Sequence, residues 1–184
     1  MATQSKQKGA AFERWVCREL SKWLTQGQRE DLFWRSAMSG GRSTIYAKRG
    51  EGAKSAMQAG DLSGIDEAGC AFINEFYVEC KHYKYLNLDS LFFEFSGTGL
   101  LMFWNQAKSN ARTLGKKTML IAKQNYKPAL ICMDVDCVGE FFEDQKVLEE
   151  LGVPLAVFMK HEMAAMPFDT FVQSAAVPHR FRRK

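Results

Sequence analysis

The sequence has no long apolar run and no N-terminus typical of an exported protein. Its uninterrupted apolar stretches, such as 119–122 and 129–133, are far shorter than the roughly 20 residues that a membrane-spanning helix needs. The first residues, MATQSKQKG, also lack the apolar core of a signal peptide. We therefore expect a cytoplasmic protein without a membrane partner.

Disulfide partners and zinc ligands are also scarce. The five cysteines make an odd number, none stands in a CxxC pair, and only three histidines accompany them. This argues against a disulfide framework and a zinc site, and we interpret the cysteines as reduced, mostly buried thiols. A different metal site built on His161, His179 and scattered acids is a weaker alternative, because their spacing matches no ligand motif.

Positive charge is modest in amount but uneven in distribution. The net charge is +4, yet 35–60 holds five basic residues and one acid, and 105–128 holds six basic residues and no acid. Segment 179–184 adds four more basic residues, while 138–150 is acidic. Such clustering favours a surface for a polyanion, although many basic runs are only solvated surface.

The pattern of apolar and turn-forming residues predicts one mixed sheet with helices packed on it. Apolar residues at helical spacing predict an amphipathic helix at 10–24. A stretch rich in Gly, Ser and Lys predicts a flexible basic loop at 38–60. The aromatic segment 85–95 fits either core or a subunit interface, and we favour core. Further strands are expected at 32–37, 61–66, 71–81, 118–123, 129–134 and 153–159, helices at 99–114 and 138–151, and a peripheral basic tail at 161–184.

Two opposite charges interrupt the apolar strand FYVECKHYK, residues 76–84. Successive strand residues point to opposite faces, so Glu79 and Lys81 share one face with side chains about 7 Å apart. The turn-forming DEAG predicts that this strand pairs with the preceding one as a β-hairpin, which would bring Asp61 close to Glu79. Two carboxylates and a lysine would then meet at one end of the hairpin.

Paired carboxylates of this kind suit a hard divalent cation such as Mg²⁺, for which Mn²⁺ often substitutes. The cation would polarise a phosphoryl oxygen and lower the pKa of a water, and Lys81 would orient or deprotonate that water. The alternative is a cross-strand ion pair on a half-exposed face, which is common and contributes little. The apolar strand, Asp61 and the basic loop before it favour the metal site.

Glu13 is a further candidate, from the first predicted helix. It falls inside the apolar arc of that helix, where a carboxylate needs a partner or a metal. Glu19 also falls inside the arc, so helical geometry alone does not choose between them. Each is otherwise explained as a residue at the edge of the core that reaches solvent.

Taken in order, these residues resemble the PD-(D/E)XK nuclease superfamily, and most of all the archaeal Holliday-junction resolvases and related phage or prophage endonucleases. The likeness covers roughly residues 6–124 and implies a restriction-endonuclease-like α/β fold, αβββαβ, with a nuclease domain at 1–160. The motifs that carry it are KGAAFERWVCREL with Glu13, RSAMSGG with Ser36 and Ser39, AGDLSGID with Asp61, and YVECK with Glu79 and Lys81.

Carried over by position, the resemblance implies a metal site of Asp61, Glu79 and the backbone carbonyl of Cys80, supported by Glu13. Lys81 would handle the attacking water. A serine of RSAMSGG would approach the phosphate. The expected DNA contacts are Ser36, Ser39, Arg42, Lys48, Arg49, Lys54, Gln106 and Lys108, of which Gln106 is equally well explained as a solvated helix residue.

The expected function is a Mg²⁺-dependent endodeoxyribonuclease, structure-selective in the manner of a junction resolvase. A homodimer acting on branched or duplex DNA in a bacterial or phage-infected cell would fit the family. Gly60 replaces the usual Pro, and the loop between Ser39 and Asp61 is longer than in compact resolvases, which leaves flaps, ends or plain duplex open as substrates. From another class, the alternative is a non-catalytic DNA-binding or assembly module on the same fold.

Overall fold

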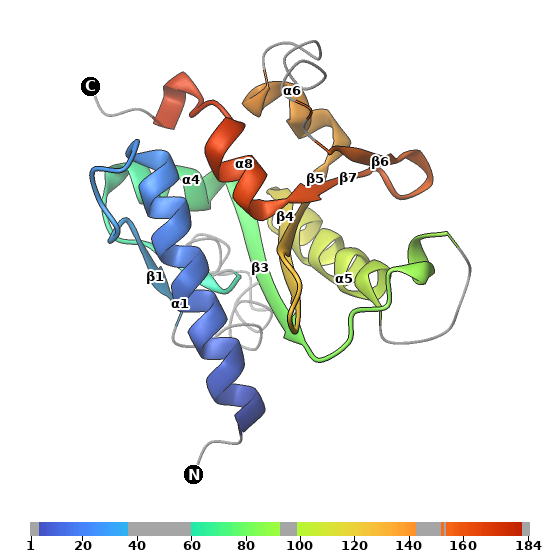
Figure 1. The fold of residues 1–184 in the computed structure, drawn as a ribbon. Helices are drawn as coiled ribbons and strands as arrows, with labels where there is room; N and C mark the ends of the chain where they lie inside the picture. The colour runs from blue at the N-terminus through green and yellow to red at the C-terminus, as the bar shows by residue number, and fades with distance from the viewer. Residues whose placement is uncertain (1–3, 37–59, 93–98, 143–151, 153, 182–184) are drawn as a thin grey trace.

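The 184-residue chain folds around a five-stranded mixed sheet (Figure 1). This computed structural model describes residues 4–36, 60–92, 99–142, 152 and 154–181. The strand order is β3-β4-β5-β7-β6, with β3 and β4 parallel and every other neighbouring pair antiparallel. The predicted mixed α/β architecture is therefore confirmed. The strands are β3 (Phe76–Tyr83), β4 (Lys117–Gln124), β5 (Ala129–Asp134), β6 (Ala156–Phe158) and β7 (Met163–Pro167).

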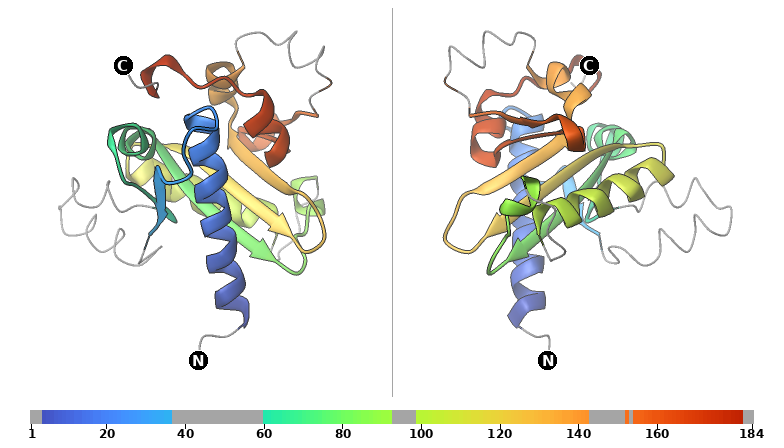
Figure 2. Two further views of the ribbon diagram at one scale, coloured as in Figure 1. Left: turned by 60° about the vertical axis from the view of Figure 1, so that its left-hand side comes forward. Right: turned by 90° about the vertical axis from the view of Figure 1, so that its right-hand side faces the viewer.

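Helices cover both faces of this sheet (Figure 2). Helix α5 (Leu100–Thr113) packs on one face, where Trp104 meets Leu120 of β4 in one buried cluster. Helices α1 (Gln4–Leu24) and α8 (Phe168–Ser174) lie on the other face, where Ile121 belongs to the larger cluster. Successive residues of β4 point to opposite faces of the sheet, so Leu120 and Ile121 belong to two different clusters.

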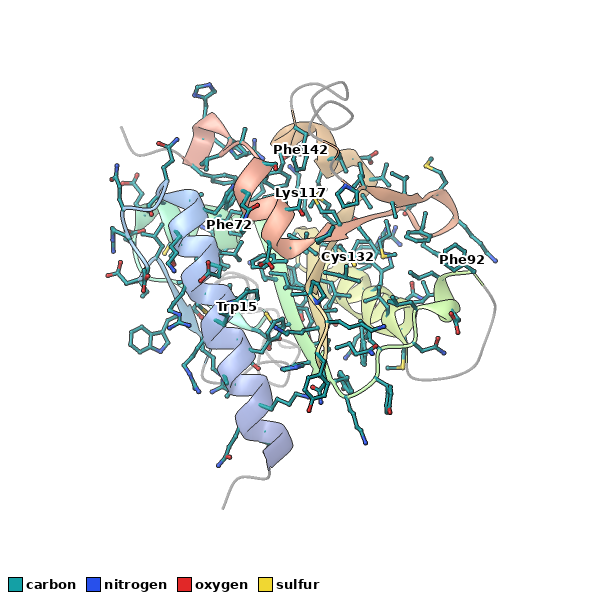
Figure 3. All side chains as sticks on the ribbon, viewed as in Figure 1. Trp15, Phe72, Phe92, Lys117, Cys132 and Phe142 are labelled. Atoms are coloured by element: carbon teal, nitrogen blue, oxygen red, sulfur yellow. The ribbon has the colours of Figure 1, made fainter. Side chains whose placement is uncertain are left out.

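Helix α1 is joined to the end of the chain through aromatic contacts. The ring of Trp15, labelled in Figure 3, packs edge-on against Phe168 of α8 with centroids 5.3 Å apart. The indole N–H of Trp23 donates to the Ala175 carbonyl at 2.9 Å. Helix α1 confirms the predicted helix at 10–24, although it begins earlier than expected, at Gln4. None of the helices in the described ranges is long and apolar enough to cross a membrane.

The predicted β-hairpin before β3 is wrong. Strand β2 (Leu62–Gly64) pairs instead with β1 (Phe33–Arg35) in a separate two-stranded sheet, and helix α4 (Glu67–Glu75) leads into β3. Asp66 caps this helix by accepting the N–H of Gly69 at 3.1 Å. The residues that α4 buries have helical spacing: Ala68, Gly69, Phe72 and Ile73.

Asp61 nevertheless reaches β3 by a different route. Its N–H donates to the Val78 carbonyl at 2.9 Å, and its own carbonyl accepts the N–H of Ser36 at 2.8 Å. Gly60 makes the approach possible, because its φ is +89° and a Cβ there would lie 2.5 Å from the Val78 carbonyl oxygen. The two sheets are thus joined directly beside Asp61.

Most of the remaining elements occur where they were expected. The predicted helix at 99–114 is α5, and the predicted strands at 118–123 and 129–134 are β4 and β5. The expected acidic helix at 138–151 begins as α6 (Val138–Phe141), but Phe142 leaves the helical conformation at φ −131° and ψ 97°. The rest of that prediction, 143–151, lies outside the described residues. Short 3₁₀ helices occur at Asp89–Leu91, Val135–Cys137, Met159–His161 and His179–Phe181.

The segment after residue 160 is not peripheral, which corrects the expectation from sequence. Strand β7 lies inside the sheet between β5 and β6, and its residues 163–166 are buried. Phe181 is 3% exposed and packs edge-on against Phe72 of α4, with centroids 5.5 Å apart. The strand signal was weak because MAAMP contains no β-branched or aromatic residue.

Candidate active site

Three of the predicted site residues meet at the free edge of β3. This strand ends the five-stranded sheet, so one of its edges has no neighbour within that sheet. The Oδ2 atom of Asp61 accepts the backbone N–H of Cys80 at 2.8 Å. The Nζ atom of Lys81 donates to Oε1 of Glu79 at 2.6 Å. Two carboxylates and an ammonium group therefore lie together, although no hairpin brings them there.

The backbone of Cys80 also faces this group. Its N–H points to Asp61 rather than to β4. In an extended strand the N–H and C=O of one residue leave on the same side. The carbonyl of Cys80 is therefore directed to the Asp61 side as well, where the resemblance expects an oxygen ligand.

Glu79 is held by hydrogen bonds to both of its oxygens. Lys81 occupies Oε1, and the buried Tyr77 hydroxyl donates to Oε2 at 2.7 Å. The Nδ2 atom of Asn110 on α5 in turn donates to the Tyr77 hydroxyl oxygen at 3.2 Å. This chain fixes the rotamer of a carboxylate that is only 8% exposed.

The electrostatics of the cluster indicate a surplus of negative charge. Burial and the nearby carboxylates of Glu79 and Glu13 together raise the pKa of Asp61 to about 7, against the lowering effects of the Cys80 N–H and Lys81. Burial lowers the pKa of Lys81, but its contact with Glu79 more than compensates, so this pKa lies above its ordinary value. Lys81 is thus a cation in this arrangement and a hydrogen-bond donor.

The structure distinguishes between the two acidic candidates on α1. Glu13 forms an ion pair with Nε of Arg35 on β1, and its charge acts on Asp61. Glu19 instead lies 3.3 Å from Nζ of Lys22, on its own helix. Glu13 is therefore the α1 carboxylate that adjoins the site.

The donor set fits a hard cation that keeps several waters. Asp61, Glu79 and the Cys80 carbonyl offer only oxygen, as Mg²⁺ prefers. Within the described ranges, no three His, Cys, Asp or Glu side chains are grouped closely enough to enclose a metal. A cation here would be held by two carboxylates, a carbonyl, water and a substrate oxygen, and its charge would relieve the repulsion that raises the Asp61 pKa.

The expected DNA-binding residues do not all lie near the Asp61 cluster. Ser36 is buried and its N–H is bonded to Asp61. Gln106 is exposed on α5 between Phe103, whose ring centroid lies 5.6 Å from Nζ of Lys81, and Asn110. Residues three and four apart share a helix face, so Gln106 borders the site. Five of the eight predicted contacts lie outside the described residues: Ser39, Arg42, Lys48, Arg49 and Lys54.

Lys108 is engaged elsewhere. Its Nζ atom lies 2.5 Å from Glu162 and 3.4 Å from Asp134, at the end of β5. His161, named in the alternative metal site, has Nε2 at 3.3 Å from the Leu91 carbonyl oxygen. Neither residue contacts the Asp61 cluster.

Three residues of the site were missed from the sequence: Tyr77, Asn110 and Arg35. Tyr77 carried a signal, because it precedes Glu79 by two positions and so shares its strand face. Asn110 and Arg35 carried none, since their roles depend on how α5 and β1 pack against β3 and α1. Only the tertiary structure brings them to the site.

The fold and this cluster together define the class. A mixed sheet with an Asp–Glu–Lys group at its edge strand is consistent with the PD-(D/E)XK fold. The chain belongs to the family described as "Phage putative PDDEXK endonuclease", which matches residues 4–174. No curated protein and no solved structure matches it.

Proposed function

We propose that this protein is a metal-dependent endonuclease that hydrolyses phosphodiester bonds in DNA. The observation that carries the proposal is the hydrogen bond from the Cys80 N–H to Asp61, which joins the two sheets where Glu79 and Lys81 also lie. Membership of an endonuclease family supports the same conclusion. The residues Asp61, Glu79 and Lys81 correspond to the motif that gives the superfamily its name, with Gly60 in place of Pro.

Each residue has a role that its surroundings support. Asp61, Glu79 and the Cys80 carbonyl would hold Mg²⁺, or Mn²⁺ in its place. When bound, the cation supplies charge stabilisation at the phosphoryl oxygen and lowers the pKa of a water. Lys81, as a cation, orients the attacking water and offsets charge that develops on the phosphate.

The remaining side chains support this arrangement. Tyr77 and Asn110 hold Glu79 in place, and Glu13 contributes negative charge beside Asp61. Water adds to phosphorus as the bond to the 3′ oxygen breaks, which leaves a 5′-phosphate and a 3′-hydroxyl.

The DNA substrate and the assembly are further parts of the proposal. Resemblance to junction resolvases favours branched DNA and a homodimer with paired sites in a bacterial or phage-infected cell. Gln106 borders the cluster and suits a contact near the cut phosphate. The predicted contacts in the loop, Arg42, Lys48, Arg49 and Lys54, would bind backbone phosphates and make affinity sensitive to salt.

A cleavage assay across DNA structures tests the proposal. Four-way junction, flap, nicked and linear duplex substrates are incubated with Mg²⁺ and the wild type, Asp61→Ala or Lys81→Ala. We expect the wild type to cut at least one substrate and both variants to lose at least 100-fold in rate. Binding measured in Ca²⁺ should persist in Lys81→Ala. Lys160→Ala, which removes a lysine between β6 and β7, serves as the matched control.

Three results would overturn parts of the proposal. Cleavage that survives Asp61→Ala or Lys81→Ala would reject the site. Tight DNA binding without cleavage in either Mg²⁺ or Mn²⁺ would favour the non-catalytic module. A wild type that cuts linear duplex as fast as junctions would reject selectivity for branched DNA and leave hydrolysis intact.

A further inference from the structure

We propose that a hollow between α1 and β1 binds an unpaired nucleotide, with its base stacked on Trp34. The inference rests on the proposed function and narrows it: the substrate carries a single-stranded segment beside the cut. Apart from Arg35, which pairs with Glu13, the residues of this surface lie outside the catalytic cluster.

The hollow has the size and lining of a nucleotide site. Its volume is about 730 Å³, within the usual range of roughly 300–1,000 Å³ for small-ligand sites. Apolar side chains, three arginines and two acids, Glu30 and Asp31, share the lining. Its principal residues are Arg14, Cys17, Arg18, Phe33, Trp34 and Arg35.

Its charge complements a phosphate backbone. Arg14 and Arg18 lie one turn apart on α1, are exposed, and form no ion pair with any residue in the described ranges. The two acids in the lining each have a cationic neighbour: Glu30 lies 3.1 Å from Lys22, and Asp31 lies 2.7 Å from Arg29. Arg14 and Arg18, which have no ion pair within the described ranges, therefore remain for backbone phosphates.

Trp34 offers an open aromatic surface inside this cationic hollow. Its side chain is 68% exposed, whereas Phe33 beside it is 3% exposed. Its cross-strand partner on β2 is Ser63, whose small side chain leaves the indole uncovered from that side. Proteins that bind single strands combine positive charge with such aromatic platforms, and stacking contributes about 1–3 kcal/mol per base.

The hollow adjoins the catalytic cluster through Arg35 and Ser36. Arg35 lines it and forms an ion pair with Glu13, while the next residue, Ser36, donates its N–H to the Asp61 carbonyl. Trp34 is in register with Ser63, two residues beyond Asp61, which corresponds to about 7 Å of strand. Stacked nucleotides advance about 3.4 Å each along one strand. The stacked base would therefore lie about two nucleotides from the phosphate at Asp61.

An intact duplex would contact the arginines of this surface but would not stack on Trp34. Its bases are stacked on one another, so their faces are not accessible to an indole, whereas its phosphates still reach Arg14 and Arg18. The two arginines should therefore affect all DNA, and Trp34 only DNA with unpaired bases. This difference separates stacking from general electrostatic attraction.

Binding measurements in Ca²⁺ test the inference without turnover. Fluorescence anisotropy is recorded for a single strand, a flapped duplex and a blunt duplex with the wild type, Trp34→Ala and Trp34→Phe. We expect Trp34→Ala to weaken binding of the single strand and the flap roughly 10-fold and of the blunt duplex less than twofold. Trp34→Phe should recover most of the loss. Tyr126→Ala, which removes a fully exposed aromatic from the β4–β5 turn, should have no effect.

The roles of Arg14 and Arg18 are tested by how strongly DNA binding depends on salt. Arg14→Ala and Arg18→Ala should weaken binding of all three DNAs similarly, and each should reduce the slope of log affinity against log salt by about one. A 2-aminopurine base two nucleotides from the cut should be quenched by the wild type and not by Trp34→Ala.

Failure of the inference is distinguishable from failure of the proposed function. Equal effects of Trp34→Ala on single strand and duplex, or no effect on either, would reject stacking while cleavage in Mg²⁺ still supports the nuclease. Trp34→Ala that alters only self-association would assign the hollow to a second protein copy and reject it as a nucleotide site. If the wild type binds none of the three DNAs, both the inference and the proposed function fail.

Discussion

The Oδ2 atom of Asp61 lies 2.8 Å from the backbone nitrogen of Cys80, so the residue directly before β2 of the small sheet is bonded to the edge of the large one. The neighbouring bond from the Asp61 N–H to the Val78 carbonyl spans the same junction at 2.9 Å. The geometry of the carboxylate cluster is therefore set by how two separate sheets dock. Changes to that junction should alter catalysis even where they spare Asp61, Glu79 and Lys81 themselves.

Gly60→Ala should disrupt this junction. The alanine would have to adopt φ +89° with its Cβ 2.5 Å from the Val78 carbonyl oxygen, so Asp61 would be displaced from β3. We expect a loss of about 1–3 kcal/mol in the free energy of unfolding, measured with urea, together with loss of cleavage. Gly27→Ala is a matched control, because Gly27 has φ +85° but open space around it. Cleavage retained by Gly60→Ala would contradict the prediction.

Asp61→Asn should change how stability depends on pH. Because the pKa of Asp61 is raised to about 7 from its ordinary 3.8, the folded protein holds a proton that the unfolded chain releases between about pH 4 and 7. Metal-free wild type should therefore lose stability as pH rises from 5 to 8. The charged groups that face Asp61 are Glu79, Glu13 and Lys81.

The amide of Asp61→Asn cannot ionise but can still accept the Cys80 N–H. We expect this variant to lose most of that pH dependence and to be more stable than wild type at pH 8 by roughly 1–3 kcal/mol. Thermal unfolding in EDTA measures both effects. Asp169→Asn, an exposed aspartate on α8, should keep the wild-type profile. A wild type that grows more stable from pH 5 to 8 would show that Asp61 is not the group responsible.

Tyr77→Phe should weaken catalysis through Glu79. The change removes the hydroxyl that donates to Oε2 at 2.7 Å and also leaves Asn110 without its acceptor. Removing an outer hydrogen bond of this kind typically costs about 10-fold or more in metal affinity or activity. Titration with Mn²⁺, followed by electron paramagnetic resonance, should show weaker binding.

Fold stability is the control for Tyr77→Phe. We expect a loss of about 1 kcal/mol, because the ring stays buried and only one hydrogen bond is removed. Asn110→Ala should have a smaller effect in the same direction, and the double variant should be no worse than Tyr77→Phe alone. Fully additive effects would argue that the two residues act separately.

Phe181→Ala should destabilise the whole domain. The ring is 3% exposed and packs on Phe72 and Phe76, so its removal should cost about 3–5 kcal/mol. Arg180 precedes it and donates to Glu75 twice at 2.7 Å, but it is partly exposed, and Arg180→Ala should cost about 1 kcal/mol or less. Urea unfolding measures both. Wild-type stability after Phe181→Ala would show that the segment is peripheral after all.

The sequence predicted what depends on local pattern. The alternation along β3 placed Glu79 and Lys81 on one face, and helical spacing identified α1 and α5. The proximity of Asp61 to Glu79 was also predicted, but it was inferred from a β-hairpin, and that hairpin prediction is wrong. Helix α4 was missed because the side chains of 72–80 alternate as they do in a strand. The buried residues of α4 also have helical spacing, so the sequence pattern did not choose between the two.

Features that depend on packing could not be predicted. A Cβ on Gly64 would lie 2.4 Å from the carbonyl carbon of Gly69, so the contact of β2 with α4 requires two glycines that look like turn residues in the sequence. The choice of Glu13 over Glu19 depends on Arg35, which belongs to another element. Strand β7 gave only a weak signal, since its small apolar residues also suit loops.

The bond between the Ser36 N–H and the Asp61 carbonyl, at 2.8 Å, has a consequence for evolution and engineering. It joins the two ends of the segment 37–59, so the chain enters and leaves that segment at one fixed point. The entropic cost of closing a loop rises only with the logarithm of its length. We therefore expect that segments of other lengths and sequences can be exchanged at this point without moving Asp61, so that members of the family can diversify their substrates here.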